Sequence, residues 1–460
     1  MTIREQPARA ATTRSRQISD YVSGARGRTF PPEVTRAAVT ALIDYIGVAV
    51  GAVNDAPVVP VRRVAESWGA RGNAPIFLGP RTTPALAALV NGTMAHAMDY
   101  DDAHQMGAGH VSCPCWSAAL ALAAQLGSDE KETLAAFITG FEVMARLGGG
   151  GPKGVGRNLH RRGFHPTSVL GRIGAAVVAS VLMRLDPRQV EYAMGIAATT
   201  ASGLVGSFGT HAKPFHGGKA AMDGILAVEL AAAGFEGATQ LLETEKGLLD
   251  CLIQDRAVEV PPLDFGARWE ILRNGFKPYA SCRATHASVQ TARSLAPQLA
   301  GRKITRVHAK VHPNVMVVAG RTDPRTPLEC KFSAAFCIAL GLRGYPLVAS
   351  DFTEATLKNR AVTELLPLIE LEVVPDQPQY EAHLDVWLEG GERLHGDTPV
   401  VLGHADNPMS EADFRTKFEG LVEPVLGKAK AGKLYALLNN FAAAGTLRKL
   451  DAMLESKKQQ

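Results

Sequence analysis

Several features that mark secreted, membrane and nucleic-acid-binding proteins are missing from this 460-residue sequence. The 49 Lys and Arg residues nearly balance the 45 Asp and Glu residues, and a net charge of +4 is too small to favour a nucleic-acid partner. The stretch from Met1 to Arg28 is basic and polar, and it has no apolar core of a secretory signal. The longest apolar run, Ile173 to Met183, is too short to span a membrane. We therefore expect a cytoplasmic protein with no membrane or nucleic-acid partner.

Cysteine and several familiar catalytic signatures are also scarce. The six cysteines show no CxxC spacing, and the pair Cys113 and Cys115 fits small apolar residues in a reducing compartment better than a redox centre. The glycine run 148–151 lacks the GK[ST] ending and the strand–loop–helix context of a phosphate-binding loop. No GxSxG elbow is present. These absences argue against disulfide-stabilised, nucleotide-binding and serine-hydrolase classes.

Aromatic residues are scarce in this chain, and small residues are common. Aromatic residues make up only 6% of it, whereas Gly alone contributes 45 residues and Ala is abundant. Because small side chains let helices approach closely, this composition favours packed helices over a β-sandwich. Apolar residues recur at spacings of three and four, and Pro or a capping residue often precedes them. The predicted helices cover residues 32–51, 83–98, 114–126, 130–147, 167–185, 187–203 and 219–234.

The pattern changes after residue 258. Val307, Ala309 and Val311 alternate with other residues, and residues 384–388 do so again before a Gly-Gly turn, which predicts β-strands. One helix is expected between them, over residues 328–342. Helical spacing returns over residues 410–421 and 432–454, and these late helices need an apolar surface to pack on. We expect an α+β module of about 130 residues followed by a tail that packs back onto the first helices.

Histidines concentrate in the first part of the chain. Eight of the 13 fall between residues 96 and 286, most of them in four short segments with Gly or Pro beside ionisable residues. Such segments predict loops held between rigid helices, where binding residues tend to lie. The segments are 96–110 (HAMDYDDAH and GAGH), 163–171 (GFHPTSVLG), 209–218 (GTHAKPFHGG) and 277–286 (KPYASCRATH).

Together these loops supply acids, bases and anion-binding groups. Histidine can take and return a proton near neutral pH. Lys213, Lys277 and Arg283 suit the carboxylates of a substrate, Arg by a bidentate fork and Lys as a point charge. This composition fits proton abstraction next to a carboxylate, where the developing charge must be stabilised.

Metal binding is the alternative chemistry for the first segment. No HExxH or comparable signature supports it. The residues with suitable ligand atoms are Asp99, Asp101, Asp102, His104 and His110.

The same segments resemble the MmgE/PrpD family, which includes 2-methylcitrate dehydratase, cis-aconitate decarboxylase and iminodisuccinate epimerase. The resemblance runs in family order from about residue 30 to about residue 450. It implies a mainly α fold, in which a large all-helical domain (1–265) is completed by the C-terminal helices (406–460) and a smaller α+β domain (266–405) is inserted. It also implies a homodimer, and chemistry on small di- and tricarboxylic acids with no metal and no cofactor.

The resemblance implies five catalytic positions, and residue chemistry and loop spacing add three candidates for substrate binding. The catalytic positions fall on Asp99 in the DYDD motif, His110 in the following loop, His165 in GFH, Lys213 in KPFH and His286 at the end of KPYASCRATH. The substrate-binding candidates are Lys277, Arg283 and His104.

Two departures from the family pattern lie where substrates should be distinguished. Ala103 stands where the family usually has Thr, which removes a hydroxyl that could hold a substrate oxygen. Val111 follows His110 where the family commonly has Pro, and the glycines of segment 107–109 precede it. The loop spacing also leaves His104 as a second candidate for the first catalytic histidine.

We interpret the chain as a cofactor-independent lyase, a dehydratase or decarboxylase, acting on an acid of the citrate, methylcitrate or aconitate type. In this hypothesis His110 or His165 moves a proton alpha to a carboxylate. Lys213, with Arg283 or Lys277, holds carboxylates; Asp99 tunes a histidine and His286 is the second acid or base. Two alternatives stay open: an epimerase of an imino- or amino-dicarboxylate such as iminodisuccinate, and an inactive carboxylate-binding or scaffold protein.

Overall fold

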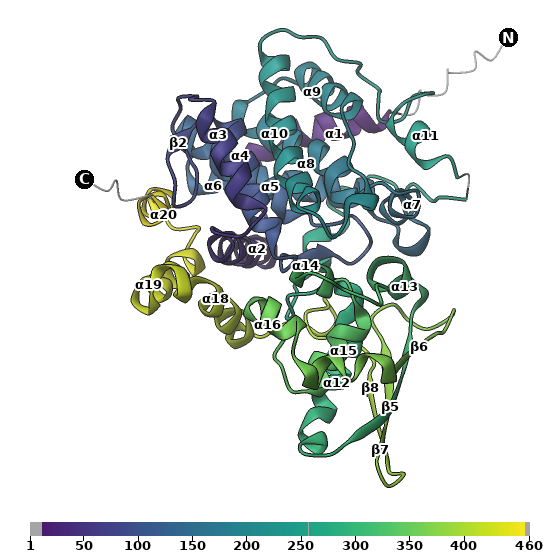
Figure 1. Cartoon of the computed structure of the whole chain (residues 1–460). Helices are drawn as coiled ribbons and strands as arrows, with labels where there is room; N and C mark the ends of the chain where they lie inside the picture. Colours follow the sequence, from purple (N-terminus) through teal and green to yellow (C-terminus); the bar gives the residue numbers. More distant parts are fainter. Residues whose placement is uncertain (1–11, 256, 456–460) are drawn as a thin grey trace, which may run out of the picture.

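The computed structural model describes residues 12–255 and 257–455, and it is mainly α-helical. Figure 1 shows one body of packed helices and, beside it, a smaller body built on a sheet. The predicted fold class, mainly α with a smaller α+β part, is therefore confirmed. The domain boundaries at residues 265 and 405 stay a prediction.

The larger body consists of helices joined by short loops and small antiparallel ribbons. Its helices are α1 (Arg14–Ser23), α2 (Pro32–Gly51), α3 (Val58–Ser67), α4 (Pro84–Ala97), α5 (Ser112–Leu126), α6 (Glu130–Gly148), α7 (Val155–Arg161), α8 (Pro166–Met183), α9 (Pro187–Thr199), α10 (Ala212–Ala232) and α11 (Leu248–Ile253). Its ribbons are formed by β1 (Ala74–Pro75) with β2 (Arg81–Thr82), and by β3 (Ala103–His104) with β4 (Asn274–Gly275).

Glycine explains how closely these helices pack. A Cβ on Gly218 of α10 would lie 2.1 Å from the carbonyl oxygen of Leu89 on α4, and a Cβ on Gly92 of α4 would lie 2.7 Å from the Cα of Gly218. The sequence predicted a loop at 217–218 and a helix from residue 219; this was wrong, because α10 begins at Ala212. The two glycines are contact points inside a helix, which a sequence alone does not distinguish from loop glycines.

Two helices of this body, α2 and α8, are long and apolar enough to cross a membrane by length and composition. The apolar window of α2 is 72% buried inside the protein and that of α8 is 94% buried. Such burial is typical of the core helices of a globular body.

The smaller body has a four-stranded sheet in the order β6-β5-β7-β8. β5 pairs with β6 in parallel and with β7 antiparallel, and β7 pairs with β8 antiparallel. Helix α12 packs on β7 and β8, and α15 packs on α12. The elements are α12 (His286–Leu299), β5 (Ile304–Val311), α13 (Pro313–Ala319), α14 (Pro327–Cys330), α15 (Ala334–Leu342), α16 (Glu354–Leu357), α17 (Arg360–Thr363), β6 (Ile369–Val373), β7 (Ala382–Leu388) and β8 (Arg393–Thr398).

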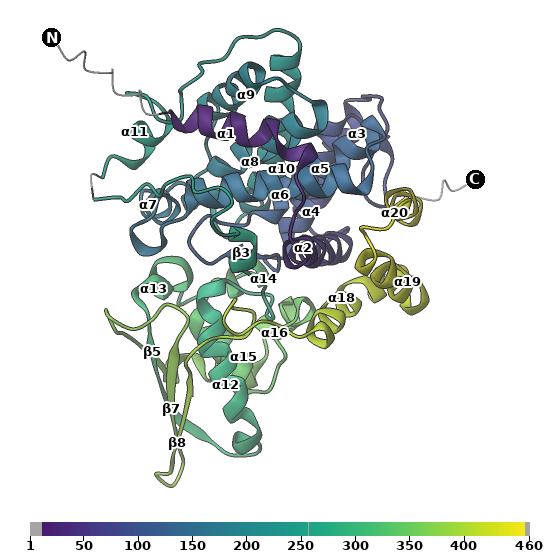
Figure 2. The same ribbon diagram turned by 180° about the vertical axis from the view of Figure 1, so that it is seen from behind.

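The C-terminal helices return to the larger body, as the sequence predicted. They are α18 (Glu411–Leu426), α19 (Lys428–Asn439) and α20 (Thr446–Leu454), and the view in Figure 2 shows them leading back past α2. α18 packs on α2, where a Cβ on Gly47 would lie 2.9 Å from the Phe418 ring. A buried ion pair, Lys417 Nζ to Asp44 Oδ1 at 2.6 Å, fixes the same contact.

Candidate active site

A cavity of about 130 Å³ lies where the two bodies meet. The larger body contributes its loops after α4 and before α8 together with the first turn of α10, and the smaller body contributes segments around residues 282 and 380. Its ionisable lining residues are Asp99, His104, His110, Arg157, His160, His165, Lys213, Lys277, Cys282, Arg283 and Tyr380. A cavity of this size, lined by two lysines and two arginines, suits a small anionic molecule.

Asp99 is the charged centre of the cavity wall. It follows the end of α4 and has a φ of +53°, a left-handed conformation that few non-glycine residues adopt. Its Oδ1 lies 2.5 Å from Lys213 Nζ and 3.0 Å from Lys277 Nζ. Burial alone would raise the pKa of Asp99, but Lys213, Lys277 and His110 outweigh it and hold that pKa far below its usual range. The carboxylate therefore stays charged and orients two ammonium groups at the cavity.

Asp101 holds two histidines with one oxygen. Its Oδ2 lies 2.8 Å from His96 Nδ1 and 3.1 Å from His110 Nδ1. The contacts of His110 and His96 outweigh burial and keep the pKa of Asp101 well below normal, so the carboxylate can only accept. His96 therefore carries its proton on Nδ1, and the contact with the carboxylate favours the same tautomer in His110, with Nε2 as the free base. In His110 this Nε2 is directed towards Asp99, 3.9 Å from its Oδ1.

His165 and His216 continue this group of rings. His165 stacks on His96 with ring centroids 5.7 Å apart, and its Nδ1 lies 3.1 Å from His216 Nδ1. The ring of Phe208 packs edge-on against His165. We call His96, His110, His165 and His216 the histidine cluster.

The members of the histidine cluster are neutral at physiological pH. Burial lowers the pKa of His110, and although Asp101 opposes this effect, Lys213 and Lys277 reinforce it. Burial also lowers the pKa of His165 well below its usual value, that of His96 to about 3 and that of His216 to about 4. Neutral imidazoles beside ammonium groups are suited to accept a proton from a carbon acid.

Arg283 is the main cation on the side of the smaller body. Its Nη1 donates to the carbonyl of Phe276 at 2.7 Å, and its guanidinium lies 5.5 Å from the Tyr380 ring centroid. Its Nη2 is buried and has no hydrogen-bond partner among the described residues. A buried N–H without a partner is costly, so this nitrogen is available to a ligand anion in the cavity.

Seven of the eight predicted site residues line this cavity, and the eighth does not. The seven are Asp99, His104, His110, His165, Lys213, Lys277 and Arg283. His104 lies 3.2 Å from Glu270 Oε2. His286 is fully buried at the start of α12, where its Nε2 contacts the Ser281 carbonyl at 3.1 Å and its ring packs against Tyr279. His286 is therefore the one predicted site residue outside the cavity lining, and its catalytic role stays a prediction.

The sequence prediction overlooked Asp101 as a partner of the histidines. It assigned the tuning of a histidine to Asp99, which lies 3.9 Å from His110 Nε2, and it did not include the contact of Asp101 with His110 Nδ1 at 3.1 Å. The DYDD motif contains three carboxylates, and no sequence signal separates their roles. Arg157, whose Nη2 donates to Gln379 Oε1 at 2.7 Å, and His160 were also missed; both follow the glycine run 148–151.

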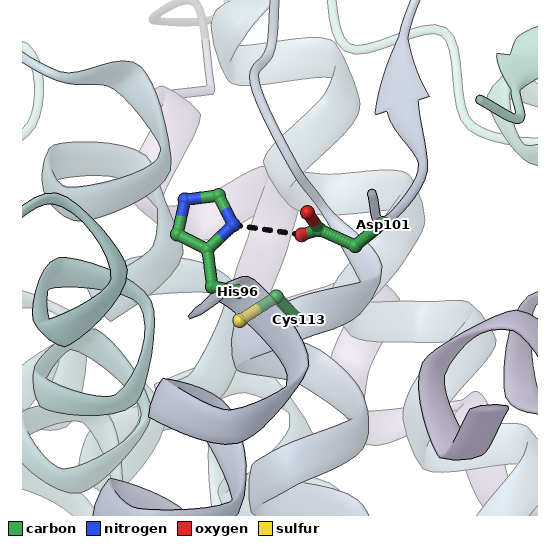
Figure 3. Close-up of side chains that lie close together, drawn as sticks. All are labelled: His96, Asp101 and Cys113. Carbon is green, nitrogen blue, oxygen red and sulfur yellow. Dashed lines mark hydrogen bonds and ion pairs between the residues drawn. The ribbon is translucent and has the colours of Figure 1, made fainter. Parts of the chain in front are cut away.

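Among residues 12–255 and 257–455, two groups have ligand atoms close enough for a metal ion: His96 with Asp101 and Cys113, and Asp99 with Asp101 and His110. Figure 3 shows the first group, in which His96 points at Asp101 while the Cys113 thiol lies to one side. The thiol contacts the Gly92 carbonyl, and burial raises its pKa well above normal, so it is a protonated donor. In the second group, the ammonium groups of Lys213 and Lys277 already pair with Asp99 and would repel a metal cation. Neither donor set fits a metal ion well.

Comparison with known proteins gives family matches along most of the chain. Residues 16–261 match the MmgE/PrpD N-terminal domain, and residues 279–441 match the MmgE/PrpD C-terminal domain. The chain is 29% identical to cis-aconitate decarboxylase of Homo sapiens over 377 residues, which cover 78% of this chain and 77% of that protein. It is 27% identical to cis-aconitate decarboxylase of Aspergillus terreus over 303 residues, 61% of each chain.

Proposed function

The chain belongs to the MmgE/PrpD family, as its motifs indicated, and from this premise we propose that it is a lyase acting on a small tricarboxylic acid of the aconitate or citrate type. Decarboxylation of cis-aconitate is the first reaction to test, because relatives that match most of the chain carry that name. The observation that carries the proposal is the pairing of a neutral, Asp101-held His110 with two ammonium groups in one cavity.

The histidines supply the proton transfer. In a dehydration Nε2 of His110 takes a proton from the carbon alpha to a carboxylate, the electron pair forms the double bond, and the hydroxyl on the neighbouring carbon leaves as water after gaining a proton from a second histidine. In a decarboxylation the carbon–carbon bond breaks, carbon dioxide leaves, and the electron pair of that bond stays on the remaining carbon framework. The negative charge of the bound substrate raises the pKa of the adjacent histidine, which takes up a proton from solvent and delivers it to that carbon. Asp101 holds the imidazole in one tautomer and stabilises it when it gains charge. His165 is the second candidate for this step, since it lines the same cavity.

The cations bind the substrate and stabilise the charge that develops. Lys213 and Lys277 stand next to Asp99, so their positions are fixed before the substrate arrives. Arg283 faces the cavity from the other body and binds a second carboxylate through its free Nη2. All of these groups belong to the chain itself, and the mechanism needs no metal or organic cofactor.

The test is ¹H NMR in D₂O with the purified protein and four acids: cis-aconitate, citrate, 2-methylcitrate and iminodisuccinate. Loss of a carboxyl group identifies a decarboxylase, and loss of water identifies a dehydratase. Solvent exchange with inversion but without loss of either group identifies the epimerase of the alternative hypothesis, which the small Ala103 side chain on the cavity wall keeps open. Lys213→Ala and His165→Ala should each lower turnover by about 100-fold or more.

An exposed lysine provides the control for these variants. Lys358→Ala changes a lysine whose side chain is 77% exposed and remote from the cavity lining, and it should leave turnover unchanged. Near-normal turnover in either cavity variant would refute the site assignment. Sedimentation analysis of the same protein tests the expected homodimer.

A further inference from the structure

The backbone that carries Asp99 is held by three buried lysines. The carbonyl oxygens of the consecutive residues 98, 99 and 100 each accept a hydrogen bond from a different lysine. Lys331 Nζ donates to the first at 2.6 Å, Lys277 Nζ to the second at 2.8 Å and Lys417 Nζ to the third at 2.7 Å. The exposed fractions of these lysines are only 7%, 1% and 7%. Three buried ammonium groups on three successive carbonyls form a specific arrangement, which we call the lysine clamp.

The lysine clamp lies where the backbone needs such donors. Helix α4 ends at Ala97 with residue 98 as its C-cap, so the first clamped carbonyl stands at the negative end of the helix and the next two follow directly after it. Lysine side chains at a helix C-terminus satisfy such carbonyls and are attracted by the helix dipole. The segment also contains the positive φ of Asp99, a conformation that persists only when its surroundings impose it.

The three lysines come from different parts of the chain. Lys277 follows β4 and lines the cavity, and Lys417 lies on the C-terminal helix α18. Lys331 follows α14 in the smaller body, so its bond to residue 98 crosses the junction between the two bodies. The neighbouring Phe332 lines the cavity, whereas Lys331 itself does not.

We infer that Lys331 is a positioning residue for the reaction: it fixes the carbonyl before Asp99 and thereby places the Asp99 carboxylate and the cations bound to it. This inference rests on the proposed function for its kinetic readout. Lys331 acts through the backbone of residues 98–99 and not through contact with the substrate.

In the described part of the chain, Lys331 lacks the paired carboxylate that each of the other two lysines of the clamp has. Lys277 pairs with Asp99 and Lys417 pairs with Asp44, but no ion pair within 4 Å involves Lys331 among the described residues. Burial lowers the pKa of Lys331 to about 8, an effect that Asp55 and Asp99 only partly oppose. A buried lysine of this kind does not stabilise the fold through its charge. A residue retained for stability would be expected to be apolar here.

The test compares Lys331→Met, Lys331→Arg and the exposed control Lys358→Met in the full-length protein. Lys331→Met keeps the alkyl chain and removes the donor, so kcat should fall by about 10- to 100-fold while KM changes less than about 3-fold. Its melting temperature should stay within a few degrees of wild type, because removing an unpaired buried charge offsets the lost hydrogen bond. Lys331→Arg restores a donor and should recover much of kcat.

A second readout does not depend on catalysis. Hydrogen exchange of the amides in segment 98–104 should become faster in Lys331→Met, with little change elsewhere, and should remain slow in Lys331→Arg and Lys358→Met. Unchanged kcat and unchanged exchange in Lys331→Met would overturn the inference, as would equal losses in the Met and Arg variants. If wild type converts none of the acids, the proposed function fails, and the exchange measurement still decides whether Lys331 fixes the segment.

Discussion

Replacing Asp101 with Asn tests how the histidines are prepared for proton transfer. One oxygen of Asp101 accepts a hydrogen bond from His96 Nδ1 at 2.8 Å and lies 3.1 Å from His110 Nδ1, so its charge favours a proton on Nδ1 of each ring. The Asn side chain has the same shape, but it offers one accepting oxygen and one donating nitrogen. With its nitrogen in the place of Oδ2, the amide drives both rings to the other tautomer, with the proton on Nε2; with its oxygen there, the rings keep their tautomer but lose the negative charge that stabilises a protonated imidazole.

The expected magnitude follows from the loss of the carboxylate that fixes the imidazole and stabilises its protonated form. When a carboxylate that fixes a catalytic histidine is replaced by an amide, turnover falls by about 10,000-fold, because the wrong tautomer dominates. Here His110 can be replaced in part by His165, so we expect kcat for Asp101→Asn to fall by about 1,000- to 10,000-fold, or about 4–5.5 kcal/mol in the barrier. KM should change less than about 3-fold, since the lysines and Arg283 that bind carboxylates are untouched.

The neighbouring carboxylate provides a matched control. Asp102 accepts hydrogen bonds from Ser112 Oγ and Asn274 Nδ2, and within the described part of the chain it forms no hydrogen bond with a histidine. Burial and the nearby Asp44 raise the pKa of Asp102 to about 7, so the residue is already partly neutral. Asp102→Asn should therefore reduce kcat less than about 5-fold. Initial rates of carbon dioxide release over a range of cis-aconitate concentrations, with ¹⁵N spectra of the imidazoles, measure both effects. If Asp101→Asn retains more than a tenth of wild-type kcat, the assignment of Asp101 is refuted.

Three further predictions concern substrate binding by Arg283, the role of His286 and the stability of the fold at low pH. Arg283→Lys should raise KM by about 10- to 100-fold with a smaller change in kcat, because a point charge replaces the fork that holds a carboxylate; an unchanged KM would show that Arg283 does not bind substrate. His286→Gln should change the pH dependence of kcat/KM little, since this ring does not line the cavity; loss of one limb of the profile would restore His286 as an acid or base. The pKa values of the histidine cluster are lowered, so below about pH 6.5 the unfolded chain binds more protons than the folded one and stability falls on acidification. Each fully buried member contributes up to about 1.4 kcal/mol per pH unit, and a urea midpoint that is constant from pH 7.5 to 5.5 would contradict this.

Helices were predictable where residues within the helix itself mark its beginning and its end. The helix over residues 32–51 was predicted with its observed bounds, because Pro32 begins it, the apolar spacing continues through it, and Gly51 ends it. The long helix predicted over 432–454 is two helices, since Gly445 adopts a left-handed conformation between α19 and α20. The sequence does not show which glycines end a helix and which lie inside a helix at a close contact with a neighbouring helix; the packed structure does.

The residues of the cavity were largely predictable, but their partners were not. His165, Lys213 and Lys277 stand in short loops or at element ends whose Gly and Pro residues mark them in the sequence. The sequence around Lys331 and Lys417 gives no such indication, because the carbonyl groups to which they donate lie more than 200 residues away in the chain. Interactions of this kind depend on the tertiary arrangement, which one sequence does not specify at the level of single side chains.

The central claim is that the cavity between the two bodies performs lyase chemistry with the chain's own residues. The most direct measurement is the rate of carbon dioxide release from cis-aconitate by wild type and Lys213→Met after dialysis against a metal chelator. The account predicts sustained release by the dialysed wild type and a loss of about 100-fold or more in the variant. Release that is equal in the two proteins would contradict it, as would the absence of any conversion of the four acids by wild type.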